Sequence, residues 1–363
     1  MKLQLLINAM EQIAPTRYAE PWDNVGLLAG DPEQVISRAM LTIDYTPAVA
    51  GEAREAKCDA IIAYHPPLFE AIKRINSESL IFDAIRRGVA IYSPHTALDV
   101  ADGGTNDMLA DALALVDRSP LKLSQTKASQ YKLVTFAPKD AIEKVSEALF
   151  KAGAGRIGQY SSCSFRSPGT GTFFGEEGTN PAVGQAGKLE QAEEIRLETV
   201  LPINRVEQVI RALKQSHPYE EPAFDLQQLA APPEGKGVGR IGRLPGDVTA
   251  EMLLNRLKRE LEIDHLLVAG DVMQLVKRAG VCAGAGGSFL DDALAQKCDL
   301  YVTGEMRHHD AQKAVKAGMV VACTLHSNSE RAVLKRLRDD LQRRLPGLEC
   351  RLSQQDRDPF SVR

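Results

Sequence analysis

Three of the seven histidines in the 363-residue sequence lie where a predicted strand ends, with an acidic residue nearby. His95 and His326 are each followed four positions later by an acid, Asp99 and Glu330, and His65 follows a third predicted strand. Ligand sites of parallel α/β sheets form at strand ends, and neutral imidazole together with carboxylate suits zinc, iron or manganese. We therefore interpret these strand ends as one candidate site for divalent metal.

Each histidine–acid pair has a second interpretation when it is taken alone. A single pair is more typical of a capped helix with a solvated carboxylate, and only its repetition at matching places favours a metal site. Glu305 also follows a predicted strand, and we interpret it either as a helix-capping acid or as a residue that orients a ligand or contacts substrate. His308 or His309 could reach the same site, whereas His217 and His265 are expected to be surface or packing residues.

Two parts of the chain resemble each other, and the resemblance runs through the candidate site. The spacing from Lys57 to His65 equals that from Lys297 to Glu305, and both segments begin with Lys-Cys-Asp. Matches in the same order predict a duplicated unit whose strand ends converge on one site. The matched segments are 25–30 with 279–284, 57–65 with 297–305, 88–95 with 318–326, and Asp99 with Glu330.

The elements that must position these residues are short apolar runs that alternate with helical patterns. Such alternation is typical of an α/β unit with parallel strands. The pattern occupies about the first 125 residues and returns after residue 275, so the α/β body is split along the chain. Predicted strands cover 39–43, 60–63, 90–93, 279–283, 300–303 and 319–324, and predicted helices cover 47–57, 79–87, 288–296 and 309–317.

The segment between the two halves has a different character and is expected to form an inserted domain. Its predicted order is β-α-β-β-α with a closing strand, which is ferredoxin-like, and 161–165 is expected to form a hairpin with 171–174. Linker-like composition flanks it at 124–127 and 231–235. The predicted domains are therefore a first core half at 1–126, an inserted α+β domain at 127–232 and a second core half at 233–363.

The composition excludes several function classes. Lysine and arginine number 44 against 48 aspartates and glutamates, and this balance of −4 argues against a chain-wide basic surface for nucleic acid. No apolar run approaches the roughly 18 to 20 residues of a membrane span, and the N-terminal stretch lacks a signal-peptide pattern. The six cysteines form no Cys-x-x-Cys pair and are expected to be reduced thiols. We therefore expect a cytoplasmic protein without a membrane partner.

The sequence resembles the family named for NGG-interacting factor three, whose bacterial members are labelled GTP cyclohydrolase type-two homologues. The resemblance spans the whole chain, and the middle segment, with HPYEEP at 217–222, is similar to the PII/CutA-like insertion of longer members. Six ordered motifs carry it: PWDNVGL at 21–27, YHPPLF at 64–69, HTALD at 95–99, GGTND at 103–107, TGE at 303–305 and HSNSE at 326–330.

This resemblance implies a pair of divalent metal ions at the strand ends of two similar α/β halves, and a ring-shaped homohexamer with its sites facing an internal cavity. Matched motif by motif, it implies His65, Asp99, His326 and Glu330 as the ligands. Many members have a second histidine just before the position of His65, where this chain has Tyr64. We therefore expect the first metal position to bind more weakly, to use water, or to recruit the histidine of the HTALD motif.

The leading hypothesis is a metal-dependent hydrolase. Two ions about 3.5 to 4 Å apart would lower the pKa of bound water and polarise the bond that it attacks. Glu305 and His95 are the candidates for a catalytic residue that moves a proton. The family label points to GTP as the substrate, although nothing in the residue spacing selects GTP.

The competing hypothesis is a non-catalytic metal-binding regulatory or adaptor protein whose inserted domain senses a ligand. Either protein would take a small molecule, such as a nucleotide, as its partner. Nucleic acid is disfavoured by the overall charge, although Arg307 and the basic helix predicted at 331–344 supply local positive charge.

Overall fold

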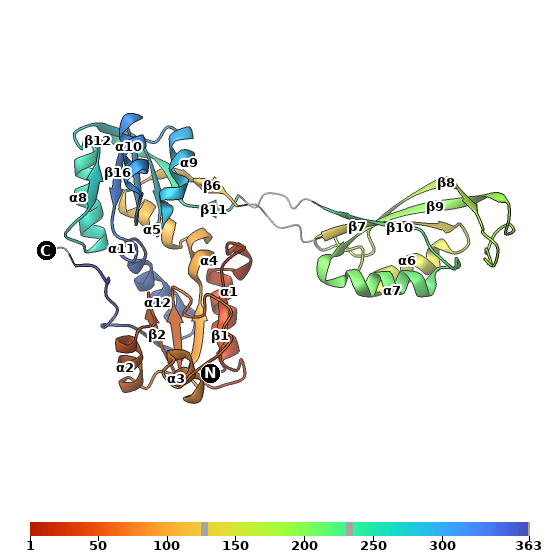
Figure 1. Ribbon diagram of the computed structural model, residues 1–363, viewed down its shortest axis with the longest axis horizontal. Helices are drawn as coiled ribbons and strands as arrows, with labels where there is room; N and C mark the ends of the chain where they lie inside the picture. Colours follow the sequence, from red (N-terminus) through yellow and green to blue (C-terminus); the bar gives the residue numbers. More distant parts are fainter. Residues whose placement is uncertain (125–129, 230–234, 362–363) are drawn as a thin grey trace. The chain divides into compact units, whose positions relative to one another are not determined.

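The structure is a computed structural model, and it describes residues 1–124, 130–229 and 235–361 (Figure 1). The chain divides into two compact units, one of Met1–Ser124 with Gly235–Arg363 and one of Gln125–Glu234. The mixed α/β fold that the sequence predicts is confirmed. The predicted boundaries at 126–127 and 232–233 lie outside the described residues.

The first sheet of the larger unit has the strand order β1-β4-β3-β2-β17. β17, β2, β3 and β4 run parallel, and β1 pairs antiparallel with β4 at the edge. β3 and β4 have the bounds that their apolar runs predict, and every residue in them is buried because helices cover both faces. The strands are β1 (Gly26–Ala29), β2 (Arg38–Thr42), β3 (Ala60–Ala63), β4 (Ala90–Ser93) and β17 (Glu349–Leu352).

Two hydrophobic clusters fix the helices on this sheet. One face packs against α1 and α12, through residues such as Leu6 and Leu337, and the other packs against α2 and α3, through Val49 and Ile81. The helices are α1 (Leu3–Ile13), α2 (Pro47–Glu55), α3 (Leu80–Arg86) and α12 (Val333–Arg344).

The second sheet of this unit has the order β13-β16-β15-β14-β12-β5. β14, β15 and β16 run parallel, and the remaining strands pair antiparallel at both sides. α5 and α8 cover one face, and α9 and α10 cover the other. The bounds are β5 (Val116–Ser119), β12 (Arg240–Thr249), β13 (Leu267–Ala269), β14 (Leu275–Cys282), β15 (Leu300–Thr303), β16 (Val320–Cys323), α5 (Thr105–Ala112), α8 (Ala250–Leu261), α9 (Leu290–Ala295) and α10 (His308–Lys316).

The two sheets share the same central order, but one of the predicted matches between them is wrong. β1 occupies the place of β13, beside β4 and β16 respectively, so residues 25–30 do not match 279–284. The true counterpart of Gly30 is Gly270, because both glycines have positive φ, 128° and 110°, and both pack closely against the neighbouring strand. Similar apolar-glycine composition at both places misled the sequence comparison.

The predicted match of residues 57–65 with 297–305 agrees with the hydrogen bonds of the two sheets. The Asp59 carboxylate accepts hydrogen bonds from the Ser37 and Arg38 backbone N–H groups, and Asp299 does the same for Lys277 and Arg278. Each aspartate therefore joins the start of its strand to the preceding strand in the same way.

The halves exchange elements across the chain. α12 and β17 come from the C-terminal segment and complete the first sheet, whereas α5 and β5 come from the N-terminal segment and complete the second sheet. The colours of Figure 1 show this exchange as a blue helix on the red and orange half. Short elements at the junction are α4 (His95–Val100), α11 (Asn328–Arg331), β6 (Lys122–Leu123) and β11 (Gly237–Val238).

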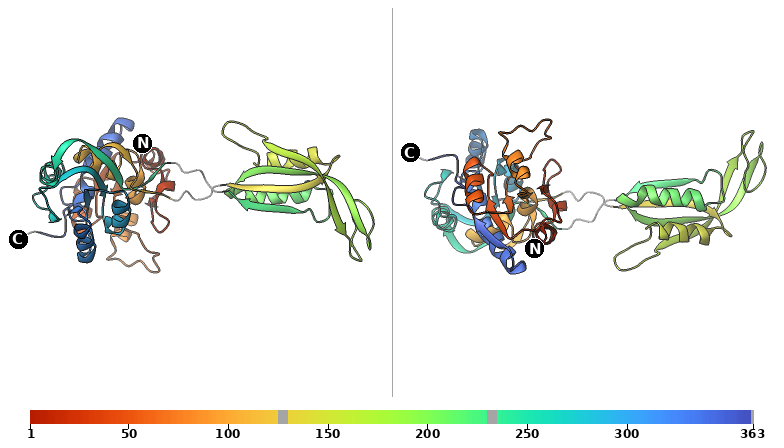
Figure 2. Two further views of the ribbon diagram at one scale, coloured as in Figure 1. Left: turned by 90° about the horizontal axis from the view of Figure 1, so that it is seen from above. Right: turned by 90° about the horizontal axis from the view of Figure 1, so that it is seen from below.

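The smaller unit is an antiparallel sheet of order β10-β7-β9-β8 with α6 and α7 on one face. The predicted hairpin at 161–174 is wrong, because residues Ser164–Phe174 form one strand, β8, paired along its length with β9. Pro168 and Gly169 suggest a turn, but β8 is an edge strand, where proline is tolerated. β8 and β9 continue beyond the two helices (Figure 2). The bounds are β7 (Gln130–Pro138), α6 (Ile142–Lys151), β8 (Ser164–Phe174), β9 (Leu189–Pro202), α7 (Val206–Ser216) and β10 (Phe224–Gln228).

Within residues 1–124, 130–229 and 235–361, no helix is both long and apolar enough to cross a bilayer.

Candidate metal centre

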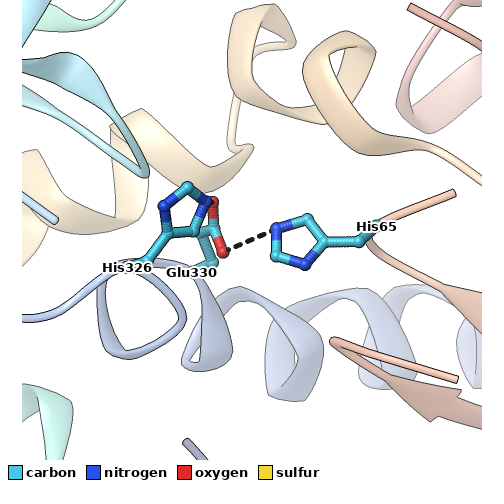
Figure 3. A group of neighbouring side chains, drawn as sticks. All are labelled: His65, His326 and Glu330. Carbon is cyan, nitrogen blue, oxygen red and sulfur yellow. Dashed lines mark ion pairs between the residues drawn. The ribbon is translucent and has the colours of Figure 1, made fainter. Parts of the chain in front are cut away.

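Three predicted ligands meet between the strand ends of the two sheets. His65 lies two residues beyond β3 of the first sheet, and His326 lies three residues beyond β16 of the second. Glu330 follows on α11 and is only 2% exposed. One ligand atom from each residue lies within 4.8 Å of the others. Figure 3 shows the carboxylate of Glu330 between the two imidazole rings.

A carboxylate holds each imidazole in one orientation. Nδ1 of His65 lies 2.9 Å from Oδ1 of Asp44, and Nδ1 of His326 lies 3.0 Å from Oε1 of Glu305. An Nδ1–H group that donates to a carboxylate leaves Nε2 as the free ligand atom, an arrangement common around protein metal ions. Both free Nε2 atoms face Glu330, at 3.1 Å for His65 and 3.4 Å for His326.

The two atoms at the centre of this group face each other. Nε2 of His65 and Oε2 of Glu330 are both buried and lie 3.1 Å apart as an ion pair, but the geometry between them is not that of a hydrogen bond. Buried polar atoms are normally hydrogen-bonded, so a pair held by charge alone leaves both atoms available to a cation. Two imidazoles and one carboxylate suit a divalent transition metal, so the residues present fit a cation.

Without a cation, a proton takes its place. Burial lowers the pKa of His65, but the neighbouring carboxylates of Asp44 and Glu330 outweigh burial and raise that pKa to about 10. The hydrogen bond from His65 in turn lowers the pKa of the Asp44 carboxyl. A binding cation therefore has to displace a proton from His65, so metal affinity should rise with pH.

The fourth predicted ligand, Asp99, is near this group but engaged elsewhere. Its carboxylate accepts a hydrogen bond from the hydroxyl of Tyr64, which also lies 3.1 Å from Oγ1 of Thr105. Burial and the charge of Glu330 raise the pKa of Asp99 to about 6. Tyr64 is itself fully buried, and burial holds its pKa well above the ordinary value. The structure thus brings three of the four predicted ligands into one group.

His95, a predicted catalytic candidate, lies beside the centre. Its ring centroid is 5.4 Å from that of His65, and its Nδ1 lies 2.7 Å from Oδ1 of Asp23. The backbone of His95 has a φ of 28°, in a region that non-glycine residues rarely occupy, so surrounding contacts must hold it. The carboxylate of Asp23 also accepts hydrogen bonds from the backbone N–H and hydroxyl of Thr96.

Glycine provides the space at the centre. A side chain at Gly284 would place its Cβ 2.8 Å from Oε1 of Glu330 and 3.3 Å from Nε2 of His326. The φ of Gly284 is 61°, and its N–H donates to Oγ of Ser329 at 2.8 Å. The turn after β14 therefore holds the helix that carries Glu330 close to the strand ends.

Sequence reasoning missed the aspartates that orient the histidines. Asp44 lies two residues beyond β2, at the same sheet edge as His65, and that placement could have revealed it. Asp23 precedes β1 and could be found only through its motif. The remaining histidines stay outside the group: His308 and His309 are exposed, and the His217 Nε2 lies 2.8 Å from the carbonyl oxygen of Phe136.

Comparisons with known proteins agree over the whole chain. A family model described as Duf34/NIF3 (NGG1p interacting factor 3) matches residues 1–359. A Bacillus subtilis (strain 168) protein named GTP cyclohydrolase 1 type 2 homolog is 36% identical over 365 residues, which cover 99% of this chain and 98% of the relative. A crystal structure of a Bacillus cereus protein related to NIF3 is 33% identical, with a TM-score of 0.65, and covers 100% of this chain and 99% of that one. A Staphylococcus aureus crystal structure is 27% identical, with a TM-score of 0.77 and the same coverage.

Proposed function

Because the chain belongs to the Duf34/NIF3 family, we propose that it is a metal-dependent hydrolase whose divalent cation is held by His65, His326 and Glu330. The observation that carries the proposal is the pair of buried atoms at the centre of this group, Nε2 of His65 and Oε2 of Glu330, which face each other at 3.1 Å without a hydrogen bond of acceptable geometry. Zinc, iron and manganese are the candidate metals, because imidazole and carboxylate ligands suit all three.

The residues around the proposed cation have different roles. A bound divalent cation supplies Lewis-acid activation of water and of the substrate bond. Asp44 and Glu305 orient the two imidazoles, so Glu305 is a positioning residue. His95 has its Nδ1 engaged by Asp23, which leaves Nε2 as the atom that could accept or donate a proton.

The number of cations depends on Tyr64. A second position, which the family resemblance implies, would need the carboxylate of Asp99 as a ligand. In this chain the Tyr64 hydroxyl donates to that carboxylate. We therefore propose one tightly bound cation in the group of three ligands and a second, weaker position at Asp99.

The substrate proposal rests on the names of relatives. The curated relatives carry the name GTP cyclohydrolase 1 type 2 homolog, so GTP is the first small molecule to test, followed by other nucleotides. We also propose the finer architecture that the resemblance implies, with two similar halves around the metal centre, a ferredoxin-like insertion and a homohexameric ring in the cytoplasm. The antiparallel order β10-β7-β9-β8 with two helices on one face supports the ferredoxin-like assignment.

Turnover with defined metal content tests the function. Protein stripped with a chelator should hydrolyse no nucleotide, and addition of zinc, iron(II) or manganese(II) should restore hydrolysis of GTP or another nucleotide. Glu330→Gln should remain inactive with any metal, whereas Glu251→Gln, an exposed substitution of the same type, should behave like the wild type. A metal-loaded wild type without turnover on any nucleotide would contradict the hydrolase proposal and favour the regulatory alternative.

A further inference from the structure

The smaller unit contains a cavity of 270 Å³ on the face of its sheet opposite to α6 and α7. Ala137 and Ile195 point toward the helices, so their neighbours Phe136 and Glu194 point to the other face. The loop after β8 and the segment after α7 complete the walls. The apolar and aromatic part of the lining comprises Phe136, Phe173, Pro181, Ala182, Val183, Tyr219 and Ala223.

The charged side chains that line this cavity are all acidic. They are Glu194, Glu220 and Glu221, and no lysine or arginine belongs to the lining. Arg196 lies on the same face of β9, where its guanidinium pairs with Glu198 at 2.9 Å and lies 5.6 Å from the ring centroid of Phe136. The three glutamates of the lining form no ion pair within the described residues, so the lining itself carries net negative charge next to aromatic rings.

One polar atom of the cavity is buried beside a carboxylate. The hydroxyl oxygen of Tyr219 is buried next to Glu194, and it makes no hydrogen bond of acceptable geometry within the described residues. Burial and the neighbouring Glu194 carboxylate raise the pKa of Tyr219 far above its ordinary value, so the hydroxyl stays protonated. A phenol hydroxyl beside a carboxylate is suited to a ligand that both donates and accepts hydrogen bonds, or that brings ordered water.

A glycine preserves the space for the carboxylate. A Cβ at Gly171 of β8 would overlap with the carboxylate of Glu194 on the adjacent strand. The absence of a side chain at this position lets Glu194 lie over β8 toward the cavity. Carboxylate and aromatic faces together favour cations, through ion pairing and through attraction to the ring electrons.

We propose that this cavity binds a small organic ammonium ion with an apolar or aromatic body. The ammonium group pairs with Glu194, and the body packs among Phe136, Phe173 and Val183. The site lies within the smaller unit and uses none of the metal ligands, so it is independent of the hydrolase proposal. Organic ammonium ions are thus the ligand class of the smaller unit.

Isothermal titration calorimetry on the full-length wild-type protein tests this site. The probes are three ammonium ions, phenethylammonium, benzylammonium and cyclohexylammonium, each compared with a matched neutral alcohol and a matched carboxylate. We expect at least one ammonium ion to bind at least about 10-fold more tightly than its alcohol, and the carboxylates to show no binding.

Two substitutions of equal charge change locate the site. Glu194→Gln should weaken ammonium binding by about 10-fold or more, because the carboxylate is lost from the cavity wall. Glu193→Gln removes one charge at the adjacent, exposed position of the same strand and should leave binding unchanged. Circular dichroism of each variant verifies that the smaller unit is folded.

Three results would overturn the proposal. They are the absence of binding by all three ammonium ions at about 10 mM, equal binding of an ammonium ion and its alcohol, and equal weakening by Glu193→Gln and Glu194→Gln. The metal content of the protein stays the same in each of these outcomes, so they leave the hydrolase proposal untouched.

Discussion

The two sheets of the larger unit place different side chains at equivalent strand ends. The N–H of His65 donates to the carbonyl of Ile43, and the N–H of Glu305 donates to Gly284 in the same way. The residue before each of them is Tyr64 in the first half and Gly304 in the second. The two halves therefore share one backbone arrangement at these strand ends. The first half is closed because the buried phenol of Tyr64 fills the space, and the second is open because Gly304 has no side chain.

The difference shows how the centre is assembled. In the first half an imidazole at the strand end is held by the carboxylate of Asp44, and in the second a carboxylate at the strand end, Glu305, holds the imidazole of His326. His65 is 24% exposed and His326 is 39% exposed, so the first half is the drier one. Glu330 joins the halves, because its two oxygens face one histidine each.

The largest effect should come from removing one ligand of either half. His65→Ala and His326→Ala should each weaken binding of zinc by about 100-fold or more, because the remaining imidazole and carboxylate cannot hold the ion alone. Competition with a chromogenic zinc chelator measures both affinities. If one alanine variant kept wild-type affinity, the centre would belong to a single half.

Tyr64 offers a way to change the number of metal ions that the closed half holds. Tyr64→His should release Asp99 and strengthen a second metal position, raising the metal content from close to one ion per chain to close to two. Tyr64→Phe removes the hydroxyl without adding a ligand, so it should stay below two. Inductively coupled plasma mass spectrometry gives the number of ions. Two ions in the wild type, or one in Tyr64→His, would show that Tyr64 does not set the number.

A smaller loss of zinc affinity is expected when the residues that orient the imidazoles are changed. Asp44→Asn and Glu305→Gln each keep a hydrogen-bond acceptor but lose its charge, which should weaken zinc binding by about 10-fold. Asp44→Asn should have the larger effect, because the His65 that it orients is less exposed. The same chelator competition measures the zinc affinities of both variants. Equal losses of affinity would show that the closed and the open half orient their imidazoles equally strongly.

The smallest effect concerns the stability of the metal-free protein. The pKa of Asp99 in the folded state, about 6, is above its ordinary value of 3.8. The contribution of protonated Asp99 to the free energy of unfolding is therefore complete below pH 3.8, and it is lost as the pH rises through about 6. Asp99→Asn should stabilise the metal-free protein by roughly 1 to 2 kcal/mol at pH 7 and by almost nothing near pH 4. Urea unfolding at both pH values measures the change, and a destabilised variant at pH 7 would contradict the burial of a charged Asp99.

The sequence predicts the elements that local composition determines. β3 and β4 are continuous apolar runs, so their bounds follow from the residues alone. The candidate ligands His65 and His326 follow from their places just beyond β3 and β16, and Glu330 follows from its spacing of four residues from His326. The match of 25–30 with 279–284 failed because glycine-rich composition cannot distinguish an antiparallel edge strand from a parallel central one.

The spacing of residues along the sequence does not predict the contacts between distant segments. The pairing of Asp23 with His95 spans 72 residues. The hydroxyl of Tyr64 reaches Asp99 over 35 residues. These hydrogen bonds depend on how strand ends face each other across the sheet edge, which only the folded arrangement reveals.

Anomalous X-ray diffraction at the zinc edge, from crystals of the wild-type protein grown with zinc, tests the central claim most directly. The account predicts an anomalous peak within about 2.0 to 2.2 Å of Nε2 of His65, Nε2 of His326 and a carboxylate oxygen of Glu330. A peak that lies elsewhere, or no peak at this group in zinc-saturated crystals, would contradict a metal centre built from both halves.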